Sequence, residues 1–225
     1  MRKCQQVRNR NYFQTISKYL GNIFYLVSKR IFDILVSFIF LLLLLPFFII
    51  IAIAVKAGSH GPVFYIQKRV GKNFKEFKMF KFRTMVTGAD RKGLLTIGAN
   101  DARVTQTGAF LRKYKLDELP QLINVLKGDM SIVGPRPEVK KYVDQYNEEE
   151  RKVMTIQPGI TDLVSIRFFN ENEILSRYED PETGYVKEVM PEKLRLNLEY
   201  MEHRSFLNDL TIIVKTIARI FSEKK

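Results

Sequence analysis

The chain has 225 residues, which suits one domain plus an anchor. Its 37 Lys and Arg residues outnumber its 24 Asp and Glu residues, for a formal net charge of +13 at pH 7. A single cysteine, Cys4, excludes an internal disulfide framework and fits a reducing cytoplasm. The two histidines, His60 and His203, are isolated from clusters of other metal-ligating residue types.

The positive charge is concentrated around one apolar segment. Residues 1–30 contain seven Lys or Arg residues and no acid, and residues 56–92 contain ten against two acids. Basic residues beside an apolar segment attract anionic lipid head groups, at about 1 kcal/mol each. A phosphate-bearing substrate would use some of these cations. Nucleic acid is the competing ligand, because residues 74–83 interleave Phe with Lys, but the position beside the apolar run favours lipid.

Residues 34–55 form this apolar run, which carries no charge and is interrupted by Pro46. At about 1.5 Å per residue the run matches a hydrocarbon core of ~30 Å. Proline removes a backbone donor, so a kink is predicted near residues 42–46, and each arm then reaches about half of the core. Flanking Lys and Arg mark the cytoplasmic side, and both flanks are basic. We therefore interpret the segment as a re-entrant helix–break–helix that enters one leaflet and returns.

Three alternatives to a re-entrant anchor fit an apolar run of this kind. A bent single span is the main one. A cleaved signal peptide is disfavoured, because the apolar stretch exceeds the usual ~7–15 residues and the basic stretch after it resists export. A buried core helix rarely needs so long a run without a charge.

Three regions follow from this interpretation. Residues 1–28 form a basic N-terminal extension, in which residues 12–27 are expected to lie as an interfacial helix. Residues 29–57 form the re-entrant membrane helix, and residues 58–225 form a cytoplasmic domain.

The cytoplasmic domain is predicted to begin with a β-hairpin. Residues 61–65 start a β-like stretch, residues 71–73 supply a turn, and residues 77–85 return as a second strand. Under the period-2 alternation of a strand, Lys81 and Arg83 share a face. They either point together at an anion or form a solvated basic edge.

From Gly108 onward the pattern becomes helical. Apolar residues at i, i+3, i+4 and i+7 over residues 119–126 predict a helix that ends near Gly128. Asp117 is placed as its N-cap and Pro120 in its first turn, where the missing N–H costs nothing.

The remaining elements are less regular. Residues 139–146 predict another amphipathic helix, and residues 163–169 are β-like. A long apolar stripe after Ser205 predicts a C-terminal helix that packs on the core or on a membrane surface. The expected fold class is α+β, mostly helical, with a short β-hairpin and amphipathic interfacial helices.

Asp117 and Glu118 are the first candidates for chemistry. A carboxylate at a helix N-terminus lies beside unpaired N–H groups and a positive dipole end, which also bind phosphate. An aspartate there is able to attack phosphorus, because aspartyl phosphates are a known covalent device. The alternative is a structural role, with Asp117 as a cap and Glu118 as a dipole partner.

The loop over residues 133–137 is the second candidate. Gly134 permits close backbone approach, and Pro135 and Pro137 preset φ on either side of Arg136. A rigid loop that presents a guanidinium suits bidentate recognition of phosphate. A proline-rich turn with a solvated arginine is the alternative.

Taken together, these segments resemble the bacterial sugar transferases, the monotopic phosphoglycosyl transferases. The resemblance runs from about Lys29 to the C-terminal helix and is most specific in its last two motifs. Those motifs are Leu-Asp-Glu-Leu-Pro-Gln-Leu at residues 116–122 and Gly-Asp-Met-Ser-Ile-Val-Gly-Pro-Arg-Pro at residues 128–137. Before them, in order, come the motif at residues 29–33, the apolar run with Pro46, and the motifs at residues 61–71 and 81–85. The chain resembles the catalytic core of such enzymes, without the N-terminal multi-span extension that some relatives carry.

The resemblance implies a reaction. Such enzymes transfer a sugar-1-phosphate from a UDP-sugar to polyprenyl phosphate, usually undecaprenyl phosphate, and release UMP. Asp117 would be the nucleophile and would form a phosphosugar-aspartyl intermediate. Glu118 would assist, either near Mg²⁺ or as a base. Arg136 would hold phosphate between Pro135 and Pro137, and further candidate contacts are Lys81, Arg83, Arg103 and Arg112.

The resemblance also implies a location and a role. The enzyme would lie at the inner membrane of a bacterium with its catalytic domain on the cytoplasmic face, and would initiate synthesis of a capsule, O-antigen, lipopolysaccharide or other glycoconjugate. The sugar and the oligomeric state, including a homodimer, are left open. Two contrasting functions remain: a membrane-anchored basic protein without enzymatic activity, and a hydrolase that cleaves UDP-sugars without a lipid acceptor.

Overall fold

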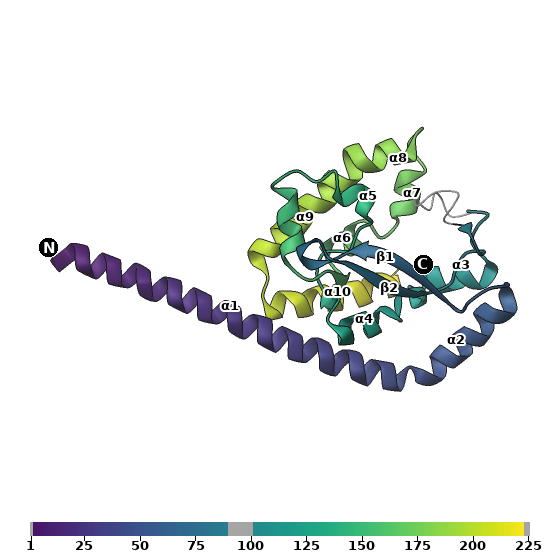
Figure 1. Cartoon of the computed structure of the whole chain (residues 1–225), viewed down its shortest axis with the longest axis horizontal. Helices are drawn as coiled ribbons and strands as arrows, with labels where there is room; N and C mark the ends of the chain where they lie inside the picture. The colour runs from purple at the N-terminus through teal and green to yellow at the C-terminus, as the bar shows by residue number, and fades with distance from the viewer. Residues whose placement is uncertain (1, 90–100, 223–225) are drawn as a thin grey trace.

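The computed structural model describes residues 2–89 and 101–222, with residues 2–20 as backbone only. Helices predominate and two small two-stranded sheets complete an α+β fold, which confirms the predicted class (Figure 1). In chain order the described elements are α1 (Arg2–Leu43), α2 (Leu45–Gly58), β1 (Phe64–Val70), η1 (Lys72–Phe74), β2 (Glu76–Phe82), α3 (Gln106–Lys113), η3 (Leu116–Glu118), α4 (Gln121–Lys127), β3 (Ser131–Val133), α5 (Lys140–Val143), η4 (Glu150–Thr155), β4 (Gly159–Thr161), α6 (Leu163–Arg167), α7 (Glu171–Leu175), α8 (Pro181–Gly184), η5 (Tyr185–Val189), α9 (Met190–His203) and α10 (Phe206–Ser222).

The apolar segment is bent where the sequence predicts a kink. α1 ends at Leu43, α2 begins at Leu45, and the two helices differ in direction by 62°. Pro46 lies in the first turn of α2, where a missing N–H costs nothing, whereas a continuous helix through it would lose a hydrogen bond. Within the described part of the chain no single helix is long and apolar enough to cross a bilayer. The bent pair meets that length and composition only when its two helices are taken together.

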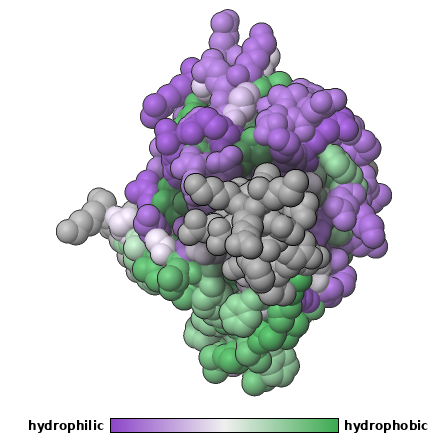
Figure 2. All heavy atoms as spheres, turned by 90° about the vertical axis from the view of Figure 1, so that its left-hand side faces the viewer, coloured by the Kyte–Doolittle hydropathy of each residue, from purple (hydrophilic) through white to green (hydrophobic). Residues whose placement is uncertain are grey.

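The bent pair exposes its apolar side chains instead of burying them. Phe38, Leu42, Phe47 and Ile53 all lie outward. Figure 2 shows hydrophobic side chains gathered at the lower edge of the molecule, where Figure 1 places the bend, below a largely hydrophilic domain surface. The alternative of a buried core helix is therefore wrong. The helix expected over residues 12–27 is present as part of α1, which continues into the apolar segment without a break.

Three side chains of the 29–33 motif join α1 to the domain. Lys29 forms an ion pair of 2.6 Å with Asp209 of α10. Arg30 donates to two carbonyl oxygens at the C-terminal end of α4, at 2.7 and 3.0 Å, where a cation also complements the helix dipole. Asp33 accepts a hydrogen bond of 3.1 Å from a backbone N–H of β3. The motif therefore fixes α1 against α10, α4 and β3.

The predicted hairpin is confirmed. β1 and β2 pair antiparallel, with Phe64 opposite Phe82 and Val70 opposite Glu76, and η1 forms the turn that follows Gly71. Phe82 packs with Val55 of α2 and Leu111 of α3 in a small core cluster. The hairpin consequently packs on α2.

The helical half of the domain matches the sequence prediction only in part. The last residue of α4 is Lys127, and Gly128 follows it as the C-cap with a φ of +86°. This agrees with the predicted helix end near Gly128. The prediction that Asp117 is the N-cap of this helix is wrong, because α4 begins at Gln121 and Pro120 occupies the N-cap position. The amphipathic helix expected over residues 139–146 is reduced to the single turn of α5.

Two further elements lie near the C-terminal end of the chain. Residues 163–169 are not β-like: Asp162 accepts a hydrogen bond of 2.6 Å from the Ser165 N–H and starts helix α6. The long C-terminal helix is confirmed as α10, and the Ser205 hydroxyl accepts from the Asn208 N–H at 3.2 Å, as a cap does. The larger hydrophobic core joins α5, η4, η5 and α9.

Candidate active site

The candidate acids lie on a tight turn. Lys115 has a φ of +55°, in the left-handed region that non-glycine residues rarely adopt, and η3 follows it directly. The Glu118 N–H donates to the Lys115 carbonyl at 3.3 Å, which closes the turn. Pro120 has no N–H to extend this ladder, so a new helix must begin after it. Asp117 and Glu118 are both buried on this turn, with 7% and 9% of their surfaces exposed.

Glu118 is held by two cations. Lys81 of β2 lies 3.0 Å from Glu118 Oε1. The Arg136 guanidinium forms a forked pair with the same carboxylate, with Nη1 at 3.1 Å from Oε2 and Nη2 on Oε1. Burial by itself raises the pKa of Glu118, but the charges of Arg136 and Lys81 outweigh burial and hold this pKa well below its usual range.

Asp117 has a different environment. Among the residues that the structure describes, its carboxylate makes no hydrogen bond and no ion pair. Burial, and then the negative charge of Glu118, raise the pKa of Asp117, while Lys81, Arg112 and Lys115 act in the opposite direction. One acid is therefore fixed as an anion and its neighbour is left free. Paired acids with divergent pKa values are typical of catalytic sites.

The loop that carries Arg136 is anchored along its length. The Gly134 N–H donates to the Thr161 carbonyl at 3.0 Å, which extends the parallel β3–β4 pairing. A Cβ at Gly134 would lie 2.5 Å from the Gln157 carbonyl oxygen, so this close approach requires glycine. The Arg136 N–H donates to Asp162 at 3.1 Å. The loop thus presents the guanidinium from a rigid backbone.

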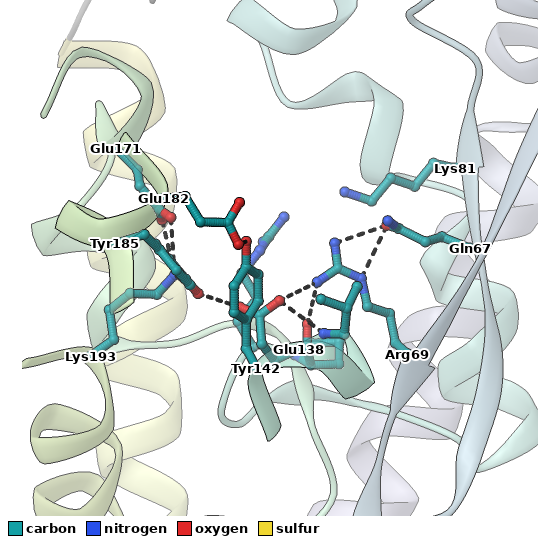
Figure 3. A network of polar contacts seen from close by, with 12 residues as sticks. Gln67, Arg69, Lys81, Glu138, Tyr142, Glu171, Glu182, Tyr185 and Lys193 are labelled. Atoms are coloured by element: carbon teal, nitrogen blue, oxygen red, sulfur yellow. Dashed lines mark hydrogen bonds and ion pairs between the residues drawn. The ribbon is translucent and has the colours of Figure 1, made fainter. Parts of the chain in front are cut away.

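A buried polar network supports the same loop from the other side. Figure 3 shows Arg69 reaching from β1 toward Glu138, with Tyr185 and Lys193 approaching from the opposite side. The Arg69 guanidinium lies 2.8 Å from Glu138 Oε1 and donates to the Pro137 carbonyl at 3.1 Å. The Tyr185 hydroxyl donates to the other oxygen of Glu138 and accepts from Lys193 at 3.3 Å.

Glu138 is an anion within this network. Burial opposes its charge, but Arg69 and Lys193 outweigh burial and lower its pKa. Because Glu138 is two residues from Arg136 and its partner Arg69 also binds the intervening Pro137 carbonyl, we expect this network to restrict the backbone that carries Arg136.

We expect Glu138→Gln to loosen the Arg136 loop. The substitution removes the charge opposite Arg69 and should destabilise the fold by about 1–3 kcal/mol. It should also make Arg136 react several-fold faster with phenylglyoxal, measured by peptide mass spectrometry, because the guanidinium leaves Glu118 more often. Glu148→Gln, at an exposed position, is the matched control. An unchanged rate of Arg136 modification would show that the loop is fixed without the Glu138 charge.

The other predicted contacts are distributed unevenly. Lys81 and Arg136 meet at Glu118, while Pro135 and Pro137 flank Arg136 in its loop. Arg112 is near enough to Asp117 to lower the pKa of that acid, and the Arg112 Nε donates to the Thr84 hydroxyl at 2.8 Å. Arg103 is paired with Asp101 at 2.6 Å.

Arg83 does not join Lys81 at the acids. Its guanidinium donates to the carbonyl oxygens of Val55 and Ser59, at 3.2 and 2.8 Å, at the C-terminal end of α2. Arg83, directly after β2, is therefore a buried cap on the C-terminal end of α2, and Lys81 and Arg83 have different partners.

Sequence reasoning missed several residues of the site. Arg69, Glu138 and Asp162 position the Arg136 loop, and Lys115 lies next to the acids. Glu138 follows the proline–arginine–proline motif directly, and that adjacency is the signal by which it could have been found.

The described residues hold no preformed metal cage. No three His, Cys, Asp or Glu side chains within residues 21–89 and 101–222 come together as metal ligands. Both oxygens of Glu118 already face cations. Asp117 is the acid that has an oxygen available.

A buried carboxylate without a partner among the described residues, next to an acid that a guanidinium and an ammonium group hold, is typical of an enzyme that handles phosphate esters. The chain belongs to the bacterial sugar transferase family, whose model matches residues 24–223.

Three curated relatives illustrate the range of similarity. A "UDP-glucose:undecaprenyl-phosphate glucose-1-phosphate transferase" of Xanthomonas campestris pv. campestris is 37% identical over 205 residues, which are 89% of this chain and 40% of the relative. A "UDP-N-acetylgalactosamine-undecaprenyl-phosphate N-acetylgalactosaminephosphotransferase" of Aeromonas hydrophila is 34% identical, over 88% of this chain and 44% of the relative. The "Exopolysaccharide production protein ExoY" of Sinorhizobium fredii is 34% identical, over 86% of this chain and 85% of the relative. The chain thus spans about two fifths of the length of the first two relatives and most of the third.

Proposed function

We propose that the protein is a membrane-bound phosphoglycosyl transferase that transfers a sugar-1-phosphate from a UDP-sugar to undecaprenyl phosphate. The donor class and the acceptor are those that the names of the relatives state. The observation that carries the proposal is the split acid pair: Asp117 is buried and free, while its neighbour Glu118 is held by Arg136 and Lys81.

The reaction would proceed in two displacements at phosphorus. An Asp117 oxygen attacks the β-phosphorus of the UDP-sugar, and the bond from that phosphorus to the oxygen of the departing UMP breaks. An oxygen of undecaprenyl phosphate then attacks the same phosphorus and breaks its bond to Asp117. The products are UMP and an undecaprenyl diphospho-sugar, and Asp117 is regenerated as a carboxylate.

Glu118 would act by holding cations rather than by accepting a proton. A general base works best when its pKa lies near the operating pH, whereas the pKa of Glu118 is held well below its ordinary value. The carboxylate instead orients Arg136 and Lys81 next to Asp117. Arg136 keeps 35% of its side chain exposed, so it has surface left for phosphate.

We propose Mg²⁺ as the cofactor. Mg²⁺ is commonly bound by one or two carboxylates together with substrate phosphates, so it needs no complete protein cage. Asp117, whose oxygens are free of the described cations, fits this requirement, and Glu118 is the second candidate ligand. When bound, Mg²⁺ would neutralise the diphosphate charge and assist departure of UMP.

The proposed location is the cytoplasmic leaflet of the inner membrane, with the bent pair as a re-entrant anchor. The bend of 62°, the basic residues on both flanks and the outward apolar side chains support it. α10 adds a second apolar surface, since Leu207, Val214, Ile217 and Phe221 lie exposed on one face of it.

The function is tested with purified protein, undecaprenyl phosphate and a panel of UDP-sugars, scored by release of UMP. Transfer predicts that UMP release requires both the lipid acceptor and one preferred sugar. The names of the relatives place UDP-glucose and UDP-N-acetylgalactosamine first in the panel. Continuous UMP release without the lipid would indicate the hydrolase, and no release with any UDP-sugar would contradict the proposal.

Topology is tested by labelling cysteines from outside intact cells. Cys4 is the single natural cysteine, and Glu148→Cys adds one at an exposed position of the domain. A re-entrant anchor predicts that neither thiol is labelled until the cells are permeabilised. Labelling of one but not the other would establish a true span.

A further inference from the structure

Three cations act on Asp117, and two of them are already engaged. Lys81 is paired with Glu118, and Arg112 donates to the Thr84 hydroxyl. The third is Lys115, an exposed side chain two residues before Asp117. Within the described part of the chain the Lys115 ammonium makes no hydrogen bond and no ion pair with a carboxylate. Of these three cations, Lys115 is thus the one whose charged group no described carboxylate or hydrogen-bond acceptor engages.

The Lys115 ammonium is held in place by an aromatic ring. Its Nζ lies 4.8 Å from the centroid of the Phe169 ring. A cation–π contact orients an ammonium group but, unlike a carboxylate, does not neutralise its charge. The left-handed backbone of Lys115 is a strained conformation, of the kind that persists at binding and catalytic sites.

The same ring connects Lys115 to the C-terminal helix. The guanidinium carbon of Arg219, near the end of α10, lies 5.3 Å from the Phe169 centroid. Two positive charges therefore meet at one ring, one from the turn that bears Asp117 and one from α10. Val214, Ile217 and Phe221 of α10 are exposed apolar side chains that suit the edge of a bilayer.

This arrangement matches the lipid substrate of the proposed function. A polyprenyl phosphate keeps its charged group at the head-group plane while its tail remains in the bilayer. Its attacking oxygen must take the place that UMP has left, in line with Asp117, but its tail must run toward the membrane. The path from Asp117 through Lys115 and Phe169 to Arg219 leads from the nucleophile to the apolar face of α10.

We infer that Lys115, oriented by Phe169, binds the phosphate of the polyprenyl acceptor, and that Arg219 attracts this phosphate from the membrane side. The inference rests on the proposed function and adds an acceptor site to it. Arg136 and Lys81, which Glu118 holds, remain on the donor.

The test separates the two half-reactions. Lys115→Gln removes the charge and Phe169→Leu removes the ring, while Lys113→Gln is the matched control, because Lys113 is also exposed and lies 5.7 Å over the ring of Tyr114. With UDP-sugar alone, the burst of UMP should stay within about twofold of the wild type in all three variants. With the acceptor present, KM for undecaprenyl phosphate should rise about tenfold or more in Lys115→Gln, as for the loss of one charge-assisted contact, and less in Phe169→Leu. Lys113→Gln should leave the KM for undecaprenyl phosphate unchanged.

A second measurement does not depend on turnover. Undecaprenyl phosphate retained by the protein is counted by native mass spectrometry in the Asp117→Asn background, with and without Lys115→Gln. The lipid should be lost only when Lys115 is replaced. Three results would each overturn the acceptor site. The first is equal lipid retention with and without Lys115→Gln, and the second is an equal KM in Lys115→Gln and Lys113→Gln. The third is a UMP burst that Lys115→Gln reduces as strongly as it reduces transfer. A wild-type protein that gives no UMP burst would instead contradict the covalent step at Asp117, and lipid retention would still decide the role of Lys115.

Discussion

Replacing Asp117 by Asn is expected to abolish sugar-phosphate transfer and at the same time to stabilise the fold. The amide cannot attack phosphorus, so the rate should fall by about 10³-fold or more, as is found when a covalent nucleophile is removed. Stability should rise because the buried Asp117 carboxylate has no partner among the described residues to offset its desolvation. The asparagine side chain carries no charge, so it avoids that cost.

The pH dependence of this stability gain follows from the direction of the pKa shift. The pKa of Asp117 is raised in the folded protein, so the folded state binds its proton more tightly than the unfolded state does. The contribution of Asp117 to stability is therefore present below the unfolded-state pKa and is lost as pH rises through the higher folded-state pKa. Asp117→Asn should raise Tm by roughly 2–5 °C at neutral pH, and the difference should shrink under acid conditions.

Thermal unfolding and intact-protein mass spectrometry check both halves of this expectation. Wild-type protein incubated with the UDP-sugar alone should gain the mass of one sugar phosphate, and Asp117→Asn should not. Asp144→Asn is the control for a change of charge alone, because Asp144 is an exposed acid at the C-terminal end of α5. Full UMP release by Asp117→Asn would falsify the covalent scheme.

The parts of the fold that are encoded locally could be predicted from the sequence. Pro46 cannot continue a helix, Asn73 adopts a left-handed conformation in the turn over residues 71–73, and Gly128 adopts a left-handed C-cap, so the bend, the hairpin and the end of α4 could all be predicted. Each of these features depends on the backbone chemistry of one residue and on its immediate neighbours.

The sequence predictions that are wrong concern segments in which two local sequence signals of similar strength compete. Residues 163–169 are rich in apolar and β-branched side chains, which favours a strand, but Asp162 supplies a helix cap and α6 forms instead. Lys81 and Arg83 obey the alternation of a strand in sequence, yet β2 ends at Phe82, and Arg83 turns to the end of α2.

The candidate site was predictable as a set of residues but not as an arrangement. The sequence singled out both Asp117-Glu118 and Arg136, and the structure brings Glu118 and Arg136 into contact. Which acid would be paired and which would be free depends on the β3–β4 pairing and on the Arg69–Glu138 network, and both join segments that are distant in sequence. No local pattern encodes that choice.

Arg136→Ala is expected to reduce both stability and transfer. Removing the guanidinium leaves Glu118 buried with Lys81 as its one remaining paired cation, and breaking such a pair should cost about 2–4 kcal/mol of unfolding free energy. The pKa of Glu118 should rise, because Arg136 is the largest influence that lowers it. Transfer should fall by about 100-fold or more, since a fixed donor to phosphate is lost.

Arg136→Lys separates charge from geometry in this prediction. A lysine restores one positive charge but not the planar fork that bonds both oxygens of Glu118, so it should recover part of the stability and little of the activity. Unfolding in denaturant and the kcat for UMP release measure the two quantities, and Arg195→Lys, at an exposed position of α9, is the matched control. If lysine restored kcat fully, the bidentate geometry at Glu118 would be irrelevant to the reaction. Arg136 would then act as a simple point charge, and the Arg69–Glu138 network that orients it would serve stability alone.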